Sequence, residues 1–165
     1  MIRSYMMSFL TNRLLLLKEK FGAQHAGPWL VWEPGDWHAP LGRAATVKTI
    51  ILEKNPSAPA KGDALCFQLA ASKPSLKVGR DPGCDVVLND ATVSREHLRL
   101  EKDAAGAWWA QPTSSERPVR CQDQVVAFGA KVQLHSGARL DLGGAQLTFY
   151  DTEALVGRLR SGAKP

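Results

Sequence analysis

The apolar positions near the N-terminus of this chain recur with the period of a helix. Leu10, Leu14 and Leu17 fall on one face, which predicts a helix over residues 4–21 that ends at Gly22. Such a helix has to bury its apolar face. It can pack on the body of the same chain, or it can dock on another protein, and the pattern leaves both alternatives open.

From residue 63 onward the pattern changes to that of β-strands. Short runs of alternating or β-branched residues follow one another between turn residues, with no helical period among them. The predicted strands are 65–70, 76–78, 85–88, 98–101, 108–110, 125–128, 131–134, 139–142 and 146–150. Many short strands without intervening helices predict an all-β sandwich or barrel.

A tryptophan-rich segment, residues 28–40, lies between these two regions. It contains Trp29, Trp32 and Trp37, and a short strand is predicted over 29–33. Tryptophan is enriched at interface hot spots, so the cluster could bind a partner. It could equally fasten the N-terminal region to the β-domain, and the sequence does not decide between the two.

The chain is therefore divided into three parts. An N-terminal extension covers residues 1–62, an all-β domain covers 63–151, and a basic tail covers 152–165. Within the extension, a β-branched run predicts a strand over 46–52, and prolines and a glycine predict a linker over 55–62. The tail has little to bury and is expected to form one or two weak helical turns at most.

Composition narrows the function classes. The 165 residues are 44% hydrophobic and carry a formal net charge of +5, which excludes global disorder. Part of that charge belongs to the termini, so nucleic-acid binding is not favoured. The apolar run from Leu14 to Leu17 is far below the roughly 20 residues of a membrane helix. We therefore expect a cytoplasmic protein without membrane insertion.

The cysteines point away from metal chemistry. Cys66, Cys84 and Cys121 are far apart and lack the paired spacing of zinc sites. They are expected to be free thiols in a reducing compartment. No nucleophile with a base and no glycine-rich phosphate loop is visible, so the sequence predicts neither an enzyme nor a cofactor.

One segment groups residues suited to bind phosphate. Gly79 and Arg80 end a predicted strand, and Ser94, Arg95 and His97 come directly before a later strand. Two loops at neighbouring strand ends thus present an arginine and a serine together. The guanidinium fork matches phosphate oxygens, and the serine hydroxyl can donate a further hydrogen bond.

This segment resembles the forkhead-associated (FHA) domain, whose signature is Gly-Arg followed, after a loop, by Ser-x-x-His. Gly79, Arg80, Ser94 and His97 match it in identity, order and spacing. The resemblance extends over about residues 63–151, including a late hairpin and a closing strand.

The resemblance implies an FHA-type β-sandwich of about eleven strands that binds phosphothreonine peptides through loops at one end. By that resemblance Arg80 and Ser94 contact the phosphate, and Arg95 adds charge or touches the peptide. Gly79 and His97 support the site, the histidine by holding the loops with hydrogen bonds rather than by touching the ligand.

A third loop departs from the family's pattern, which places Asn-Gly after a serine or threonine. Ser114 and Ser115 keep the hydroxyl groups, but Glu116 and Arg117 stand where Asn-Gly is expected. A glutamate carboxylate repels a phosphate. Arg117 either compensates or pairs with Glu116. The predicted phosphopeptide-binding residues are Arg80, Ser94, Arg95, Ser114, Ser115 and Arg117.

The leading prediction is a phosphothreonine-dependent adaptor module in kinase signalling. Its partner would be a threonine-phosphorylated protein, either a Ser/Thr kinase or its substrate, and the N-terminal helix offers a second contact surface. The alternative is a phosphate-independent interaction scaffold with a degenerate FHA site.

Overall fold

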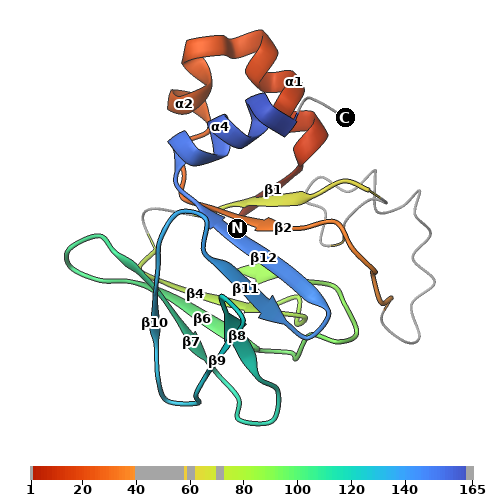
Figure 1. Ribbon diagram of the computed structural model, residues 1–165, viewed down its shortest axis with the longest axis vertical. Helices are drawn as coiled ribbons and strands as arrows, with labels where there is room; N and C mark the ends of the chain where they lie inside the picture. Colours follow the sequence, from red (N-terminus) through yellow and green to blue (C-terminus); the bar gives the residue numbers. More distant parts are fainter. Residues whose placement is uncertain (1, 40–57, 59–61, 70–72, 163–165) are drawn as a thin grey trace.

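The chain forms a β-sandwich with a helical layer at one end (Figure 1). The computed structural model describes residues 2–39, 58, 62–69 and 73–162. Within these residues twelve strands form two sheets, of seven and five strands. The predicted all-β, FHA-type sandwich is confirmed.

The two sheets are almost entirely antiparallel; β4 and β5 alone, among the described strands, pair in parallel. The larger sheet has the order β1 (Arg3–Met6), β3 (Leu65–Gln68), β2 (Trp29–Trp32), β12 (Ala145–Tyr150), β11 (Arg139–Leu142), β8 (Val119–Cys121) and β9 (Gln124–Val126). The smaller has the order β10 (Val132–Leu134), β7 (Trp108–Pro112), β6 (Leu98–Lys102), β4 (Ser75–Gly79) and β5 (Val86–Val87).

Alternate side chains of both sheets fill the space between them. Leu76 and Val78 from β4 and Leu98 and Leu100 from β6 are completely buried there. Each such side chain stabilises the fold by roughly 1.5–3 kcal/mol relative to an exposed one. The ends of β4 and β6 are thereby held in fixed register, with Val78 opposite Leu98, and the loops that follow them start from rigid positions.

The strand β2 has no alternation because both of its faces are buried. Leu30 and Trp32 face the core between the sheets, whereas Trp29 and Val31 face the helical layer. Trp29 and Trp32 are 0% and 3% exposed, so these two tryptophans pack within the chain. Although it precedes residue 63, β2 lies inside the larger sheet, between β3 and β12.

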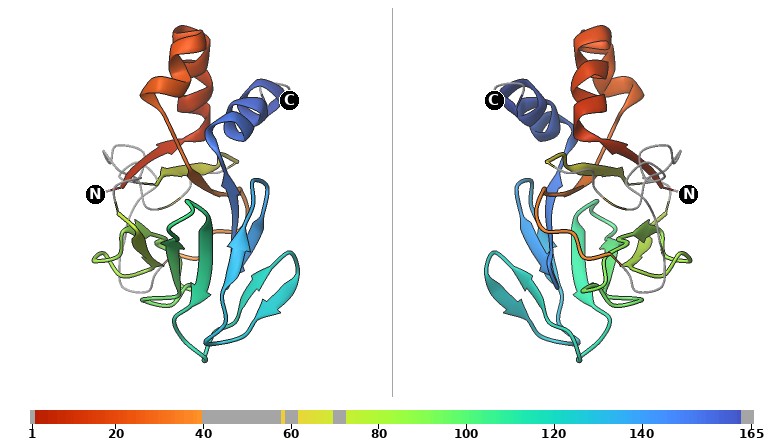
Figure 2. Two further views of the ribbon diagram at one scale, coloured as in Figure 1. Left: turned by 90° about the vertical axis from the view of Figure 1, so that its left-hand side faces the viewer. Right: turned by 90° about the vertical axis from the view of Figure 1, so that its right-hand side faces the viewer.

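The helical layer covers the outer face of the larger sheet at one end, as Figure 2 shows. It consists of α1 (Met7–Leu17), the short 3-10 helix η1 (Lys18–Lys20), α2 (Phe21–Gln24) and α4 (Thr152–Gly162). Leu10, Leu14 and Phe21 pack there with Leu155 and Leu159. The predicted apolar face of the N-terminal helix is therefore buried on the chain itself.

The helix predicted over 4–21 is wrong at both ends. Residues Arg3–Met6 form β1, because their backbone pairs with β3 in the order Arg3↔Gln68 to Met6↔Leu65. Gly22 does not stop the helix but lies within α2. In both places tertiary packing overrides the local signal.

Two other elements also differ from expectation. The predicted weak tail is an eleven-residue helix, α4, since Leu155 and Leu159 find an apolar face and Arg158 pairs with Glu33 at 2.5 and 2.6 Å. The strand β8 was not predicted, because Val119–Cys121 is short. The strand predicted over 46–52 lies outside the described residues, as does most of the linker predicted over 55–62.

A buried histidine sits between the helices and the sheet. His25 is 6% exposed, and neither ring nitrogen has a hydrogen-bond partner among the described residues. Its ring lies among those of Tyr5, Phe21 and Trp29, at centroid distances of 4.8–6.4 Å. Burial lowers the pKa of His25, with Arg13 and Arg3 adding to the effect. The histidine is therefore neutral in the folded chain at neutral pH.

Replacing this histidine by phenylalanine should stabilise the fold in acid. The unfolded chain binds a proton at the ordinary pKa near 6.5, whereas folded His25 binds one only at lower pH, so its contribution to stability is lost as pH falls below that value. We expect His25→Phe to raise the free energy of unfolding by about 1 kcal/mol near neutrality and to flatten its decline in acid. Urea unfolding at several pH values measures both. A decline identical to that of the unmodified chain would contradict this prediction.

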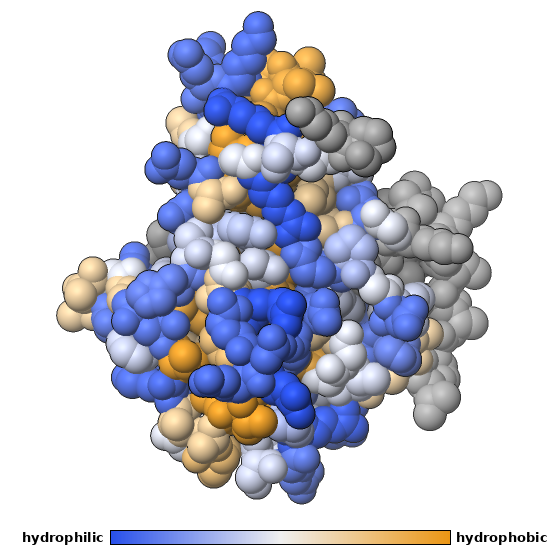
Figure 3. Space-filling model, in the orientation of Figure 1, coloured by the Kyte–Doolittle hydropathy of each residue, from blue (hydrophilic) through white to orange (hydrophobic). Residues whose placement is uncertain are grey.

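The surface shown in Figure 3 is largely hydrophilic, with apolar areas near the two ends of the molecule. The large apolar side chains exposed among the described residues are Phe9, Leu15, Leu16, Val125 and Phe128. None of the described helices combines the length and the apolar character needed to cross a membrane.

Candidate functional site

The predicted loops meet at the end of the sandwich where β4 stops and β6 starts. Arg80 follows β4 directly, and Ser94 and Arg95 lie in the serine loop, which we define as residues 88–97. The Arg80 N–H donates to the Ser94 carbonyl at 2.9 Å, and the Asp81 N–H donates to the Arg95 carbonyl at 3.1 Å. The structure therefore brings the Gly-Arg and Ser-x-x-His segments together.

Glycine at position 79 makes this approach feasible. A Cβ atom built on Gly79 would lie 2.1 Å from the Arg95 carbonyl oxygen and 2.9 Å from the Glu96 Cα. Both are backbone atoms, so no rotation of a flexible side chain could relieve the overlap. The two loops touch at a distance that only glycine allows.

The side chain of Arg80 is half-buried and held from one side. Its Nε donates to the Val93 carbonyl at 3.0 Å. Within the described part of the chain, its two terminal nitrogens and the Ser94 hydroxyl have no hydrogen-bond partner. A fixed guanidinium with unused donors, next to an unused hydroxyl, is suited to an oxyanion.

His97 lies underneath this pair and is 0% exposed. Its Nδ1 accepts from the Ser94 N–H at 3.1 Å, so the proton of a neutral ring resides on Nε2, which faces the Pro118 carbonyl at 3.4 Å. Burial lowers the pKa of His97; the Pro118 carbonyl opposes this effect, and Arg117 adds to it. The buried neutral imidazole thus joins the serine loop to the loop after β7.

The loop after β7 reaches the serine loop through Arg117. The Arg117 Nη1 donates to the Thr92 carbonyl at 2.6 Å, and the described residues show no ion pair with Glu116. The Ser114 hydroxyl accepts from the Glu116 N–H at 3.1 Å. Ser115 is exposed. The third loop therefore lies at the same end of the sandwich, with Ser114 used to shape its own turn.

An open pocket of about 450 Å³ adjoins these loops. Thr92, Arg117, Arg120 and Gly143 line it, together with Asp141. The two exposed arginines outnumber the one carboxylate. The charged side chains that line the pocket therefore carry a net positive charge.

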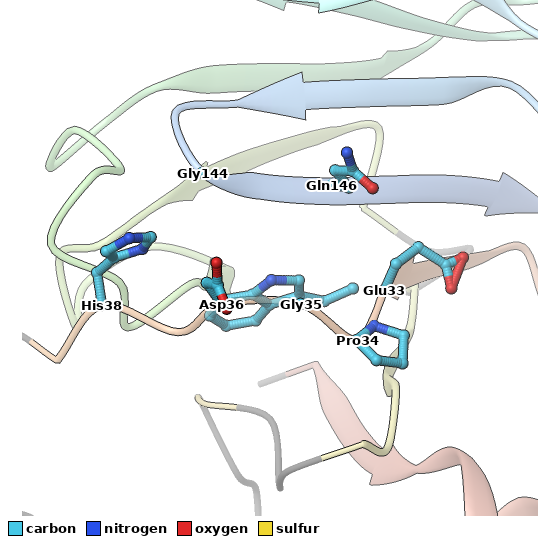
Figure 4. Close-up of a pocket in the computed structure, with 8 residues that line it drawn as sticks. Glu33, Pro34, Gly35, Asp36, His38, Gly144 and Gln146 are labelled. Atoms are coloured by element: carbon cyan, nitrogen blue, oxygen red, sulfur yellow. The ribbon is translucent and has the colours of Figure 1, made fainter.

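Sequence reasoning missed four residues that shape the serine loop: Trp37 and His38, which bind it from outside, and Asp90 and Thr92, which lie within it. The tryptophan-rich composition of residues 28–40 was the available signal, but it did not say which loop Trp37 contacts. Figure 4 shows the segment from Glu33 to His38 passing β12, with His38 beside the turn at Gly144.

The three cysteines are buried free thiols. Burial raises the pKa of Cys84 to about 11, with Glu96, Asp81 and Asp85 adding to the effect and Lys77 opposing it. Its Sγ contacts the Arg95 carbonyl at 3.2 Å. A thiol of this pKa is protonated at neutral pH, so Cys84 supports the loop rather than acting as a nucleophile.

Two solved FHA domains with TM-scores above 0.5 agree with the fold. The FHA domain of an Arabidopsis thaliana hypothetical protein has a TM-score of 0.51 and 22% identity, covering 76% of this chain and 86% of that one. An engineered FHA domain solved with a Myc-pTBD peptide has a TM-score of 0.51 and 17% identity, covering 82% and 98%. The FHA domain of a Chlamydia trachomatis protein has a TM-score of 0.49 and 17% identity, covering 76% and 98%.

A search of curated proteins finds no match to the chain. The family model described as "Inner membrane component of T3SS, cytoplasmic domain" matches residues 61–153, which is more than half of the 165 residues. The matched range contains both the Gly-Arg and the Ser-x-x-His segments. The chain therefore belongs to this family of T3SS inner-membrane-component cytoplasmic domains and carries an FHA-type domain.

Proposed function

We propose that this chain is a phosphothreonine-dependent protein-binding module that acts as an adaptor in kinase signalling. One observation carries the proposal. The Arg80 guanidinium is fixed by the Val93 carbonyl, while its terminal nitrogens and the Ser94 hydroxyl are unused among the described residues. FHA-type domains are interaction modules, and this arrangement supports phosphate as the recognised group.

The charges around the site favour a dianion. Arg80 and Arg95 stand on the two facing loops, and Arg117 stands on the third. Of the nearby carboxylates, Asp81 accepts from the Gly83 N–H at 2.7 Å, and Glu96 pairs with Lys77 at 3.2 Å. These two carboxylates are thus engaged away from Arg80, which leaves its charge available to a ligand.

The recognised residue would be phosphothreonine on a cytoplasmic protein, either a Ser/Thr kinase or its substrate. Ser94 and Arg95 would complete the phosphate contacts that Arg80 begins, and Ser115 and Arg117 would contact the peptide backbone beside it. The engineered FHA domain of matching fold is described with a Myc-pTBD peptide, which supports a peptide as the ligand class.

The proposal is tested by titrating the full chain with a degenerate phosphothreonine peptide library. The same library without phosphate, its unphosphorylated twin, is titrated in parallel. We expect binding to the phosphorylated pool and at least about 30-fold weaker binding to the twin, since the twin lacks the charge-assisted bonds to Arg80. Equal binding of both pools would refute the phosphate mechanism.

A second candidate function is a phosphate-independent scaffold, and the third loop favours it. Glu116 is an exposed carboxylate in the position where the family has asparagine, so it can neither donate to a peptide carbonyl nor attract a phosphate. This scaffold predicts that a partner captured by the chain stays bound after phosphatase treatment. The phosphothreonine module predicts release.

The role of Arg117 gives a separate prediction. If Arg117 replaces the missing asparagine, Arg117→Ala should weaken phosphopeptide binding about 5–10-fold, because it removes both a charge and the bond to the Thr92 carbonyl. Isothermal titration measures the loss. Arg160→Ala, which removes an exposed arginine from α4, is the matched control and should leave the phosphopeptide affinity unchanged. Unaltered affinity in Arg117→Ala would mean that Arg117 does not replace the asparagine in binding.

A further inference from the structure

A segment outside the signature is fastened to the serine loop. We call residues 33–38, which leave β2, the strap. The Trp37 Nε1–H donates to the Asn89 carbonyl at 2.7 Å, and the Ala91 N–H donates to the His38 carbonyl at 2.8 Å. The Glu33 N–H donates to the Gln146 carbonyl at 2.8 Å, which anchors the start of the strap on β12. The strap therefore bridges the larger sheet and the serine loop.

Asp90 is the buried centre of this connection. Its side chain is 1% exposed, and its Oδ2 accepts from the His38 N–H at 3.0 Å, with the His38 Nδ1 at 3.5 Å. Its Oδ1 accepts from the Thr92 N–H at 2.8 Å and from the Thr92 hydroxyl at 2.5 Å. A buried carboxylate is tolerated only when it is paired and hydrogen-bonded, and these contacts satisfy both oxygens. One carboxylate thus ties the strap to the interior of the serine loop.

Thr92 links Asp90 to the residues of the candidate site. Its hydroxyl accepts from the Gly144 N–H at 2.7 Å, and its carbonyl accepts from Arg117. The next residue, Val93, supplies the carbonyl that holds the Arg80 Nε, and Ser94 follows it. One residue, Val93, therefore separates the carboxylate-bound Thr92 from Ser94, whose carbonyl accepts from the Arg80 N–H.

The turn after β11 closes the other side of Thr92. A Cβ atom on Gly143 would lie 2.2 Å from the Thr92 carbonyl oxygen, and the φ of Gly143 is +59°. Thr92 thus contacts the Gly143–Gly144 turn on one side and the Asp90 carboxylate on the other. Asp90 in turn is bound to the strap. Figure 4 shows His38 next to this turn, on the strap side.

We propose that Trp37, His38 and Asp90 are positioning residues that hold the serine loop in its ligand-ready conformation. A loop fixed before binding needs no ordering when the ligand arrives, so its affinity is higher than that of a mobile loop. The strap then sets how tightly the site binds, although no strap residue touches the ligand. The effect on affinity rests on the proposed phosphothreonine function, whereas the effect on the loop does not.

Trp37→Phe tests the proposal with little change in volume, because it removes the indole N–H and keeps an aromatic ring. The matched control is Trp109→Phe, which removes the Nε1–H bond to Asp103 at 2.8 Å in the β6–β7 region. We expect Trp37→Phe to speed hydrogen exchange of the Ala91, Thr92 and Ser94 amides about five-fold or more, the effect of one hydrogen bond. The control should leave them unchanged.

Affinity is the second measurement, made with the tightest phosphothreonine peptide from the library at a temperature where all variants are folded. We expect the affinity to fall about five-fold in Trp37→Phe. It should fall further in Asp90→Asn, because the asparagine amide nitrogen would face an N–H donor that a carboxylate oxygen now accepts from. The conservative His38→Gln should retain most of the affinity, since the backbone bonds of residue 38 remain. A structural role alone would lower the melting temperature and leave the affinity of the folded chain unchanged.

The outcomes separate the two proposals. Unchanged exchange of the serine-loop amides in Trp37→Phe overturns the positioning role, whatever the chain binds. Faster exchange with an unaltered phosphopeptide affinity overturns it as well, because the loop position would then not matter for binding. If the unmodified chain does not distinguish the phosphorylated peptide from its twin, the proposed function fails, and the exchange measurement still decides whether the strap holds the loop.

Discussion

Arg80→Ala is expected to weaken binding of a phosphothreonine peptide by at least about 30-fold, corresponding to about 2 kcal/mol or more. The alanine removes the guanidinium whose Nε is fixed on the Val93 carbonyl and whose remaining donors have no partner among the described residues. A phosphate dianion at Ser94 would then be left partly unpaired. Isothermal titration with the phosphorylated peptide and its twin measures the difference.

The control for this variant is Arg160→Ala, which lowers the net charge equally but lies in α4. It should retain the affinity of the unmodified chain, apart from a small effect at low salt. The free energy of unfolding of Arg80→Ala should fall by only about 1 kcal/mol, since one hydrogen bond is lost. If Arg80→Ala binds the peptide as tightly as the unmodified chain does, recognition of phosphate at this site is excluded and the scaffold alternative remains.

Gly79→Ala is expected to have the largest effect on the fold near the site. The added methyl would stand 2.1 Å from the Arg95 carbonyl oxygen, so the serine loop has to move away from β4. That movement breaks the bonds from the Arg80 and Asp81 amides to the Ser94 and Arg95 carbonyls. We expect the free energy of unfolding to fall by about 3 kcal/mol or more, at the upper end of overpacking effects, and phosphopeptide binding to be lost.

Urea denaturation measures this loss, with Gly157→Ala in α4 as the matched control. Nothing lies within 4 Å of a Cβ atom on Gly157, so that alanine should stabilise the chain by up to about 1 kcal/mol through helix propensity. A Gly79→Ala chain as stable as the unmodified one would mean that the contact between the two loops is not needed for the fold.

The β-domain was predictable because its signals are local. Strands such as β6 and β11 alternate apolar and polar residues, and turn residues separate them, so their positions were predicted from the pattern alone. The segments around Gly79 and Ser94 were recognisable for the same reason, since each is a short run at a strand end. The structure adds how close the two segments lie. The lack of a side chain at Gly79 permits this short distance, and the hydrogen bond from the Arg80 N–H to the Ser94 carbonyl maintains it.

The N-terminal region was harder to predict because its structure depends on distant partners. Arg3–Met6 is a strand since it pairs with β3, about 60 positions later, and Trp29–Trp32 is buried on both faces since the helices and the core cover it. The C-terminal α4 forms on the same apolar face and is fixed by the bond of Arg158 to Glu33. Local propensity contains no information about these partners.

By itself, the sequence determined an all-β domain with a Gly-Arg and Ser-x-x-His pair at adjacent strand ends, because alternation and turn residues are properties of neighbouring positions. The FHA type followed from the resemblance of that pair to the family's signature. Only the tertiary structure decided that Arg117 reaches Thr92 and that the strap is hydrogen-bonded to the serine loop. The bond of Trp37 to Asn89 joins residues 52 positions apart, and only the packed sheets bring them together.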